Sequence, residues 1–208
     1  EVARVGHAVN MFRPVCDVGH DHRFWEYSIA LASLGSREAV KGMRIADVGC
    51  GSSLLPGLLV WHGAHVTAVD VSNHAGAQTE MGRRGSSSVW GATPGGTLEF
   101  VQSDGIAGLG EFDAVFSISV IENYEPAEEF FGKLLKAVKP GGVLVLTTDF
   151  YPTGEARCDG HVRTYNAERL EKLAAAPGFS SPGGFDYRYD GDFVFNYSFG
   201  SLHLKRAG

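Results

Sequence analysis

The sequence has few cysteines, and they are far apart. Cys16, Cys50 and Cys158 are the three cysteines of the chain. Disulfide frameworks and zinc sites need paired or clustered cysteines, so this spacing predicts neither. A reducing cytoplasm is the simpler expectation for such a chain. The first residue is Glu1 rather than Met, which leaves a removed signal peptide open.

Long apolar runs and an excess of positive charge are also absent. The longest apolar stretches, such as Gly142 to Thr147, are much shorter than the roughly 20 residues that span a bilayer. Asp and Glu number 24 against 18 Lys and Arg. Nucleic-acid affinity depends heavily on basic residues that neutralise phosphates, so this balance gives no general attraction to a polyanion. We therefore expect no membrane and no nucleic acid as a partner.

Glycine, by contrast, is abundant. The chain has 28 glycines among 208 residues, and 44% of its residues are hydrophobic. This mix is typical of a globular protein with many tight turns. The length fits one domain that buries a continuous core under a sheet of several strands. We expect a single domain over residues 1–208.

Short apolar strand patterns alternate with helical patterns along the chain. Phe24, Tyr27, Leu31 and Leu34 recur at spacings of three and four, which predicts a helix over 23–34. Strands are predicted at 44–48, 65–69, 98–102, 112–118, 143–148, 185–189 and 201–205. Further helices are predicted to begin at Ser52 or Ser53, at Ser72, at Pro126 and near Asn166, with a turn at Lys139 to Gly142.

This order of elements predicts an α/β fold. We expect a Rossmann-like, doubly wound and mostly parallel seven-stranded sheet, with helices on both faces and an antiparallel C-terminal strand. Ligands of such sheets bind beyond the carboxyl ends of the parallel strands. The residues that directly follow the strands are therefore the candidates for a binding site.

The turn after the first strand is rich in glycine. It reads Asp47-Val48-Gly49-Cys50-Gly51-Ser52-Ser53. Glycines let a backbone turn sharply and approach a ligand, and the next helix presents unbonded amides and the positive end of its dipole. A ligand carboxylate would suit that end. A turn needed only for packing is an equal alternative for an isolated GxG pattern.

Aspartates end the next two predicted strands. Asp70 can accept hydrogen bonds from both hydroxyls of an unphosphorylated ribose. Asp104 can accept a bond from an adenine amino group, with the Gly105 amide facing a ring nitrogen. The alternatives are a helix-capping role for Asp70 and a turn role for Asp104.

Taken together, these segments resemble the class I S-adenosylmethionine-dependent methyltransferases. The resemblance covers about residues 44–149 and rests on five segments in order, Ile45 to Gly51, Val69 to Ser72, Ser103-Asp104, Phe112 to Ser117 and Leu135 to Leu144. It implies S-adenosylmethionine as the cofactor and S-adenosylhomocysteine as its product. The implied cofactor-binding residues are Asp47, Gly49, Cys50, Gly51 and Ser53 on the methionyl side, Asp70 and Val71 at the ribose, Asp104 and Gly105 at the adenine, and Ser117 in the pocket wall.

The resemblance also implies a division of the single domain. Residues 1–40 would form a covering helical region, 41–150 the cofactor-binding core, and 151–208 a substrate-side loop with the C-terminal strands. The acceptor is expected to be a small molecule or a saccharide methylated on oxygen or nitrogen. After the fourth predicted strand the chain lacks the Asn/Asp-Pro-Pro-aromatic signature of enzymes that methylate DNA bases.

Candidate catalytic residues lie on the loops beyond the sheet. His161 is the first candidate for a general base, because histidine titrates near neutral pH and this loop follows the fifth strand. Glu122 is the second candidate. For His161, an exposed loop position or a helix-capping role is an equal alternative to catalysis. No metal is expected, since the His20 and His22 pair lacks a third ligand nearby. The candidate substrate-side residues are Tyr27, Tyr124, Tyr151 and Arg163.

Two other functions compete with methyl transfer. A noncatalytic protein could keep the cofactor fold as a sensor or a supporting subunit, because fold alone does not determine function. A nicotinamide-dependent dehydrogenase is the other alternative. Its fingerprint needs a third glycine at the position of Leu54, where helix and strand pack closely, so this sequence argues against it.

Overall fold

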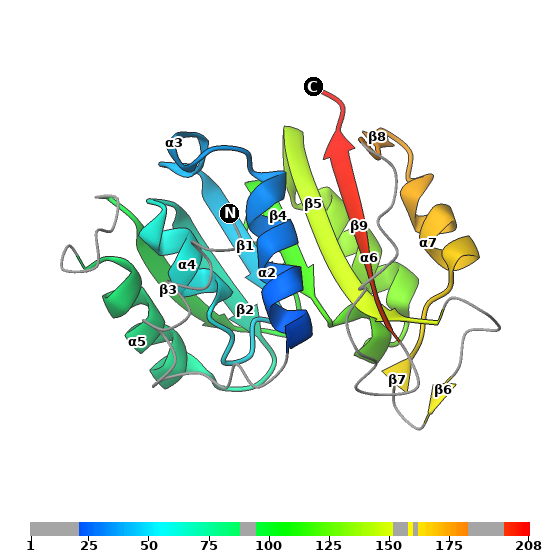
Figure 1. Ribbon diagram of the computed structural model, residues 1–208, viewed down its shortest axis with the longest axis horizontal. Helices are drawn as coiled ribbons and strands as arrows, with labels where there is room; N and C mark the ends of the chain where they lie inside the picture. The colour runs from blue at the N-terminus through cyan, green and yellow to red at the C-terminus, as the bar shows by residue number, and fades with distance from the viewer. Residues whose placement is uncertain (1–20, 88–94, 152–157, 160–161, 183–197) are drawn as a thin grey trace.

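The sheet of this protein has seven strands in the order β3-β2-β1-β4-β5-β9-β8. The computed structural model describes residues 21–87, 95–151, 158–159, 162–182 and 198–208 (Figure 1). The strands are β1 (Arg44–Val48), β2 (His65–Asp70), β3 (Thr97–Gln102), β4 (Phe112–Ile118), β5 (Val138–Phe150), β8 (Phe179–Ser180) and β9 (Ser198–Arg206).

The first five strands of this sheet are parallel, and β9 is antiparallel to both of its neighbours. β1 pairs in parallel with β2 and β4, β2 pairs with β3, and β4 pairs with β5. β9 lies between β5 and β8 and runs against both. The predicted fold class is confirmed, including its antiparallel C-terminal strand.

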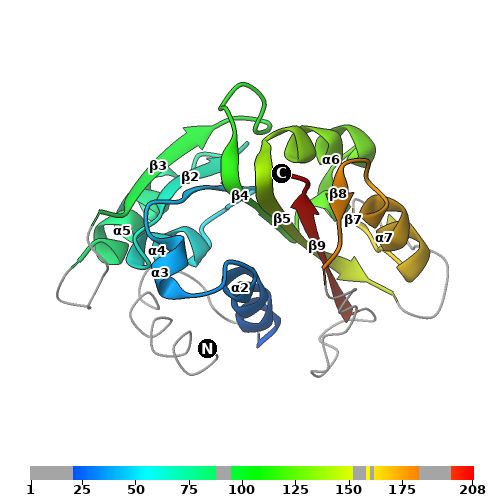
Figure 2. The same cartoon turned by 90° about the horizontal axis from the view of Figure 1, so that it is seen from above.

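Helices cover both faces of the sheet. They are α2 (Asp21–Ser33), α3 (Arg37–Val40), α4 (Leu55–Trp61), α5 (Ala75–Gly85), α6 (Ala127–Lys136) and α7 (Ala167–Ala174), with a 3-10 turn η2 (Ile121–Asn123). Turned by 90°, the structure shows α2, α4 and α5 on one side of the sheet and α6 and α7 on the other (Figure 2). A short hairpin of β6 (Cys158–Asp159) and β7 (Val162–Arg163) lies outside the main sheet.

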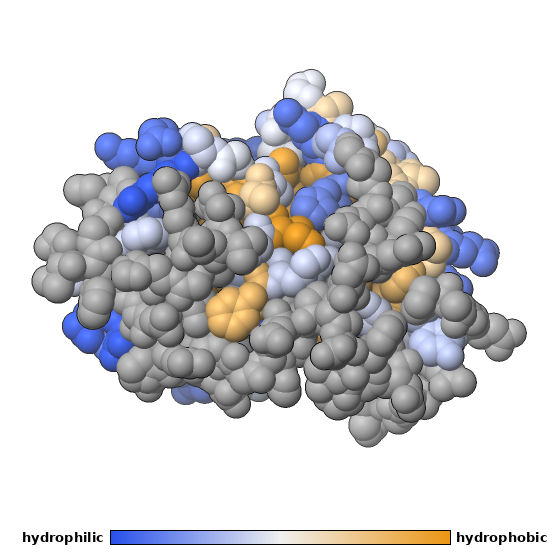
Figure 3. Space-filling model, in the orientation of Figure 1, coloured by the Kyte–Doolittle hydropathy of each residue, from blue (hydrophilic) through white to orange (hydrophobic). Residues whose placement is uncertain are grey.

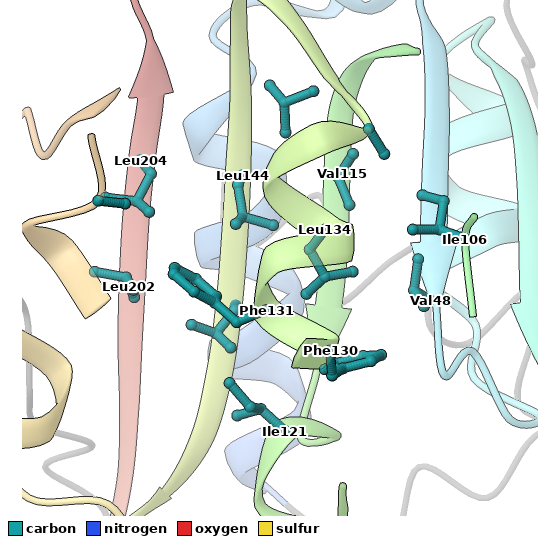
Figure 4. Packing of buried hydrophobic residues seen from close by; sticks show 14 of the residues in the cluster. Val48, Ile106, Val115, Ile121, Phe130, Phe131, Leu134, Leu144, Leu202 and Leu204 are labelled. Atoms are coloured by element: carbon teal, nitrogen blue, oxygen red, sulfur yellow. The ribbon is translucent and has the colours of Figure 1, made fainter. Parts of the chain in front are cut away.

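Each face of the sheet has its own hydrophobic core. Successive side chains of a strand point to opposite faces, so Ile45 packs in the core beneath α2 and α4 while Ala46 packs in the core beneath α6. Figure 4 shows the second core, in which Phe131 and Leu134 of α6 lie over Leu144 of β5. In Figure 3, the most strongly hydrophobic residues described on that view lie near its middle, and many of the hydrophilic ones lie along its left and right sides.

The predicted starts of two helices are wrong. α4 begins at Leu55 with Leu54 as its N-cap, and α5 begins at Ala75 with His74 as its N-cap. Neither helix has a side-chain cap bond. The predicted cap Ser72 instead uses its amide, which donates to Asp70 Oδ1 at 2.8 Å. By contrast, the helix predicted near Asn166 begins there, since the Asn166 side chain accepts from the Arg169 amide at 2.9 Å.

Other differences concern short or irregular elements. The predicted turn at Lys139 to Gly142 forms the beginning of β5, where Gly141 has a φ of 76° and the pairing with β4 shifts register. The two-residue strands β6, β7 and β8 were not predicted. The strand predicted at 185–189 lies outside the described residues. Within the described ranges, no helix is long and apolar enough to cross a membrane.

Leu134 offers a direct test of the second core. Its side chain is fully buried, so Leu134→Ala should leave a cavity and lower the free energy of unfolding by about 2 to 5 kcal/mol. Leu135, the next residue of α6, is only partly buried and provides the matched control. In urea denaturation, Leu135→Ala should lower the free energy of unfolding by less than half as much as Leu134→Ala. Equal losses in the two variants would contradict this description of the core.

Candidate functional site

Two cavities lie at the carboxyl ends of the parallel strands. Cavity A has a volume of about 410 Å³ and cavity B about 230 Å³. They meet at Gly49 and Ser119, which line both. The other residues of cavity A are Val48, Val69, Asp70, Val71, Ser103, Asp104, Gly105, Val120, Asn123, Tyr124 and Phe130. Those of cavity B are Arg23, Tyr27, Asp47, Cys50, Gly51, Ser52, Ser53 and Ile118.

The glycine turn after β1 needs its glycines. Gly49 and Gly51 have φ values of 78° and 51°, in the left-handed region that side chains with a Cβ rarely adopt. A Cβ on Gly49 would also collide with the side chain of Val120. The amides of Gly49 and Cys50 both donate to the carbonyl of Val69, at 2.8 and 3.0 Å. The turn therefore ties the end of β1 to the end of β2.

The backbone of Gly51 is held by two side chains, one from β2 and one from α5, which both follow it in the chain. Its amide donates to Asp70 Oδ2 at 2.8 Å, and its carbonyl accepts from Gln78 Nε2 at 2.9 Å. Gln78 is fully buried on α5. Sequence analysis missed this residue, although its spacing of three from the buried Met81 places a polar side chain on the inner face of the helix.

The Asp70 side chain accepts hydrogen bonds from two backbone amides, and it also lines cavity A. Its Oδ2 accepts from Gly51 and its Oδ1 accepts from the Ser72 amide. A carboxylate oxygen can accept more than one hydrogen bond, so both oxygens keep capacity for ligand hydroxyls. His74, not Asp70, is the N-cap of α5.

Aromatic side chains form one wall of cavity A beside Asp104. The Tyr124 hydroxyl donates to the Asp104 carbonyl at 2.6 Å. The Tyr124 ring stacks on Phe130, with centroids 4.3 Å apart and an interplanar angle of 21°. Gly105 and Val71 line the same cavity. Tyr124, expected on the substrate side, therefore lies with the residues expected at the adenine.

Cavity B is polar and contains a buried carboxyl group. Asp47 is almost fully buried, and burial together with the nearby charge of Asp70 raises its pKa to about 7, although a hydrogen bond from Ser53 opposes the shift. Its Oδ2 has no hydrogen-bond partner among the described residues. Among those residues that line the two cavities, Arg23 is the only Lys or Arg. The cavity thus offers one cation and one carboxyl group to a ligand.

Tyr27 and Cys50, two further predicted residues of cavity B, have buried side chains. Burial raises the pKa of the Tyr27 hydroxyl, and burial likewise raises the pKa of the Cys50 thiol. A thiol with a raised pKa is a poor nucleophile at neutral pH, so Cys50 serves as part of the cavity wall. Tyr27 reaches this cavity from α2.

Ser119 occupies the junction of the cavities in place of the predicted Ser117. Ser117 is fully buried and is not among the residues that line either cavity. Ser119 has a φ of 53°, and its amide bonds to the carbonyl and the hydroxyl of Thr147, both at 3.1 Å. Its hydroxyl donates to Glu26 Oε1 at 2.6 Å. Sequence analysis missed both Ser119 and Glu26, because their contact joins residues far apart in the chain.

The candidate catalytic residues are only partly described. Glu122 lies in η2 and is almost fully buried, and its Oε2 has no partner among the described residues. Burial, with the charges of Asp149 and Glu26, raises the pKa of Glu122 well above its usual value. Glu122 is not among the residues that line cavities A and B. His161 lies outside the described residues.

The structure places the remaining predicted residues only in part. Tyr151 follows β5, and its amide donates to the Tyr165 carbonyl at 2.7 Å. Arg163 belongs to β7, but its side chain is not described. In the described part of the chain, no three His, Cys, Asp or Glu side chains are grouped to hold a metal ion. The side chains of His20 and His22 lie outside that part.

The sequence of the core matches known methyltransferases. Residues 46–146 match a family described as a methyltransferase domain. The mitochondrial ubiquinone biosynthesis O-methyltransferase of Schizosaccharomyces pombe is 34% identical over 114 residues, which cover 54% of this chain and 40% of that protein. The ubiquinone biosynthesis O-methyltransferase of Rickettsia bellii is 28% identical over 109 residues, covering 52% and 43%. This chain spans less than half the length of these curated relatives.

Solved structures share the fold over nearly the whole chain. The magnesium protoporphyrin IX methyltransferase of Synechocystis PCC 6803, with bound S-adenosylhomocysteine, has a TM-score of 0.67 at 18% identity and covers 97% of this chain and 95% of its own. The 1,6-didemethyltoxoflavin-N1-methyltransferase of Burkholderia thailandensis has a TM-score of 0.67 at 16% identity, with coverage of 98% and 87%. The [4+2]-cyclase SpnF has a TM-score of 0.68 at 16% identity, with coverage of 98% and 95%.

The matched segment, the strand order and the site at the carboxyl ends of β1 and β2 agree with one another. Residues 46–146 match a methyltransferase domain, and the chain has the fold of solved S-adenosylmethionine-dependent methyltransferases. The family resemblance inferred from its sequence is thereby confirmed.

The raised pKa of Asp47 predicts a pH-dependent loss of stability. A folded-state pKa of about 7 lies above the unfolded value near 4, so the neutral carboxyl contributes its full stability at low pH. That contribution declines above about pH 4 and is lost as the pH rises through about 7. Between pH 5 and 8 the parent should therefore lose about 2 to 3 kcal/mol of unfolding free energy relative to Asp47→Asn.

Denaturation of both proteins at the two pH values measures this difference. Asp113→Asn is the control. Burial opposes ionisation of Asp113, but bonds from Lys139 and the Arg44 amide outweigh it and lower its pKa. The Asp113→Asn variant should lose the same unfolding free energy between pH 5 and 8 as the parent, because it retains Asp47. The same pH dependence in parent and Asp47→Asn would refute the assignment.

Proposed function

We propose that this protein binds S-adenosylmethionine and transfers its methyl group to an oxygen atom of a small-molecule acceptor. The observation that carries the proposal is the pair of cavities that meet at Gly49 and Ser119. Cavity A offers groups suited to a ribose and an adenine, and cavity B offers a cation and a carboxyl group. A ligand with a nucleoside at one end and an amino acid at the other matches both.

The residues of cavity A fit the adenosine part of this cofactor. Asp70 would accept hydrogen bonds from the ribose hydroxyls, with Val71 beside them. Asp104 and Gly105 would bind the polar edge of the adenine. The stacked rings of Tyr124 and Phe130 provide an aromatic wall for its flat faces.

The residues of cavity B fit the methionyl part. The Arg23 guanidinium would bind the carboxylate, and Ser52 and Ser53 of the glycine turn line the same cavity. The Asp47 Oδ2 is buried and lacks a partner in the described structure, and a ligand ammonium would supply one. A bound ammonium would also favour the ionised carboxylate, because opposite charges lower a carboxyl pKa.

Methyl transfer asks little covalent chemistry of the protein. The sulfonium of the bound cofactor supplies an electrophilic methyl group. The chain must hold the acceptor oxygen in line with the breaking bond and exclude water from it. Gly49 and Ser119 would lie beside the sulfur, because it connects the parts of the ligand that occupy the two cavities.

A hydroxyl acceptor needs a group that takes its proton. We propose His161 for this role, since an imidazole is partly neutral at physiological pH. Glu122 is the second candidate. Burial, with the charges of Asp149 and Glu26, raises its pKa and so favours the protonated carboxyl over the carboxylate that a base requires. Tyr27, Tyr151 and Arg163 remain proposed contacts for the acceptor.

The names of the relatives favour an oxygen acceptor. The matched curated proteins are O-methyltransferases, whereas the Burkholderia thailandensis structure is named for methylation of a nitrogen atom. A nitrogen acceptor is therefore the second candidate. Within the described residues, nothing favours a saccharide over another small molecule.

We also propose the division of labour within one domain. Residues 1–40 would cover the cofactor, 41–150 would bind it, and 151–208 would supply the acceptor side. Action in the cytoplasm agrees with Cys50, which is a buried cysteine outside any disulfide.

The likeness to a [4+2]-cyclase keeps a function other than methyl transfer as a competing candidate. A cofactor-binding protein without methyl turnover would share the same cavities. A dehydrogenase is disfavoured, because the position of its third glycine holds Leu54, whose side chain is fully buried.

Calorimetric titration with S-adenosylmethionine, S-adenosylhomocysteine and oxidised nicotinamide dinucleotide tests the cofactor. We expect micromolar binding of the first two alone. Asp70→Ala should weaken that binding by roughly 10- to 100-fold and Asp104→Ala by roughly 3- to 10-fold, since hydrogen bonds to charged groups are lost. Asp113→Ala, at the start of β4, is the control and should bind like the parent. Unchanged binding by Asp70→Ala would show that the site is misplaced.

His161→Ala tests the proposed base. Turnover with a hydroxyl acceptor should fall by about 10²- to 10⁴-fold while cofactor affinity stays close to that of the parent. His65→Ala, at the exposed beginning of β2, is the matched control. Glu122→Gln keeps the size and shape of the side chain and should retain most activity, because the proposal assigns the proton to His161. Full activity of His161→Ala would remove this residue from the mechanism.

A further inference from the structure

Glu26 is a fully buried carboxylate that joins α2 to the ends of two strands. Its Oε1 accepts from the hydroxyls of Ser119, after β4, and Thr147, in β5, at 2.6 and 2.5 Å. Its Oε2 accepts from the Arg23 guanidinium at 2.8 Å. In Figures 1 and 2, the first turns of α2 lie over the carboxyl ends of the parallel strands, on the face opposite α6.

The cost of burying this group indicates a purpose beyond helix packing. A buried charge destabilises a protein unless it is paired and hydrogen-bonded, and an apolar side chain of similar size often serves packing as well or better. α2 already packs by apolar contacts through Tyr27, Ala30 and Leu31. The burial of the Glu26 carboxylate is therefore best explained by the positions in which it holds its hydrogen-bond donors.

The donors lie on either side of cavity B. Arg23 lines cavity B from α2, and Ser119 lines it from the end of β4. Ser119 also lines cavity A. The Glu26 carboxylate thus fixes Arg23, which is the single basic side chain of the described cavity walls. It also fixes Ser119, which lies at the junction of the two cavities.

The backbone of Ser119 depends on such support. A φ of 53° is uncommon for a residue with a side chain, and such conformations persist where surrounding contacts hold them. Here three hydrogen bonds hold it, two to Thr147 and one to Glu26. Thr147 is itself bonded to Glu26, so the carboxylate supports Ser119 directly and through its neighbour.

We propose that Glu26 is a positioning residue for the amino-acid end of the bound cofactor. The inference rests on the proposed function, in which Arg23 binds the ligand carboxylate. Glu26 holds the guanidinium toward cavity B and holds Ser119 at the junction. Removal of the Glu26 carboxylate should therefore weaken the binding of ligands that carry an amino-acid end. The binding of ligands that lack this end should stay unchanged.

Two product-like ligands separate this role from a purely structural one. S-adenosylhomocysteine carries both ends, whereas 5′-methylthioadenosine has the same adenosine and thioether but no amino acid. In calorimetry, Glu26→Gln should weaken the first by about 10-fold and change the second by less than about twofold. Glu80→Gln is the matched control, because Glu80 is also bonded to arginines but lines neither cavity. It should change neither affinity.

A second variant tests the route of the effect. Arg23→Gln should cause the same selective loss, and the double variant should lose no more than Arg23→Gln alone, since residues that act as one unit are not additive. Arg23 is partly exposed, so this variant decides the question if Glu26→Gln does not fold.

Two outcomes would overturn the inference. Equal weakening of both ligands would show a general loss of structure, and unchanged affinity for both would show no role in binding. A parent protein that binds neither S-adenosylmethionine nor S-adenosylhomocysteine would instead refute the proposed function. The two failures are therefore distinguishable.

Discussion

The two hydrogen bonds that hold the Gly51 peptide set the position of the rest of the site. Asp70 binds its amide from the end of β2, and Gln78 binds its carbonyl from α5. The turn after β1 is thus fixed by the unit that follows it in sequence rather than by a cap on α4. Asp70 also lines cavity A, so the same carboxylate that orders the turn faces that cavity. Under the proposed function, folding and ligand binding would depend on the same side chain.

The strands were predictable because their apolar runs are set by burial on both faces. β1 and β4 begin and end where the sequence pattern places them. Helix starts were not predictable from Ser52, Ser53 or Ser72, since α4 and α5 begin further along the chain without a side-chain cap. In the folded chain the Ser53 side chain bonds to Asp47, and the Ser72 amide bonds to Asp70. Strands of two residues, such as β8, carry too short a pattern to detect.

The site was predictable where one short segment contains the chemistry. The glycine turn and Asp70 fall in such segments, and the structure places them around the cavities. Glu26, Gln78 and Ser119 act through contacts between distant elements, which a single sequence does not reveal. Tyr124 shows the same limit. Its position after β4 suggested the acceptor side, but its ring stacks on Phe130 and turns toward Asp104.

The place of β9 constrains the order in which the sheet is completed. β9 follows β8 in the chain, yet among the described strands β8 pairs with β9 alone, which lies beside β5. As the chain is synthesised, β8 therefore has no strand to join until β9 has emerged and paired with β5. Until then, the edge of β5 has unpaired backbone groups, and the second core lacks Leu202 and Leu204. Nascent chains of this protein thus expose the edge of β5 until β9 has been synthesised and pairs with it.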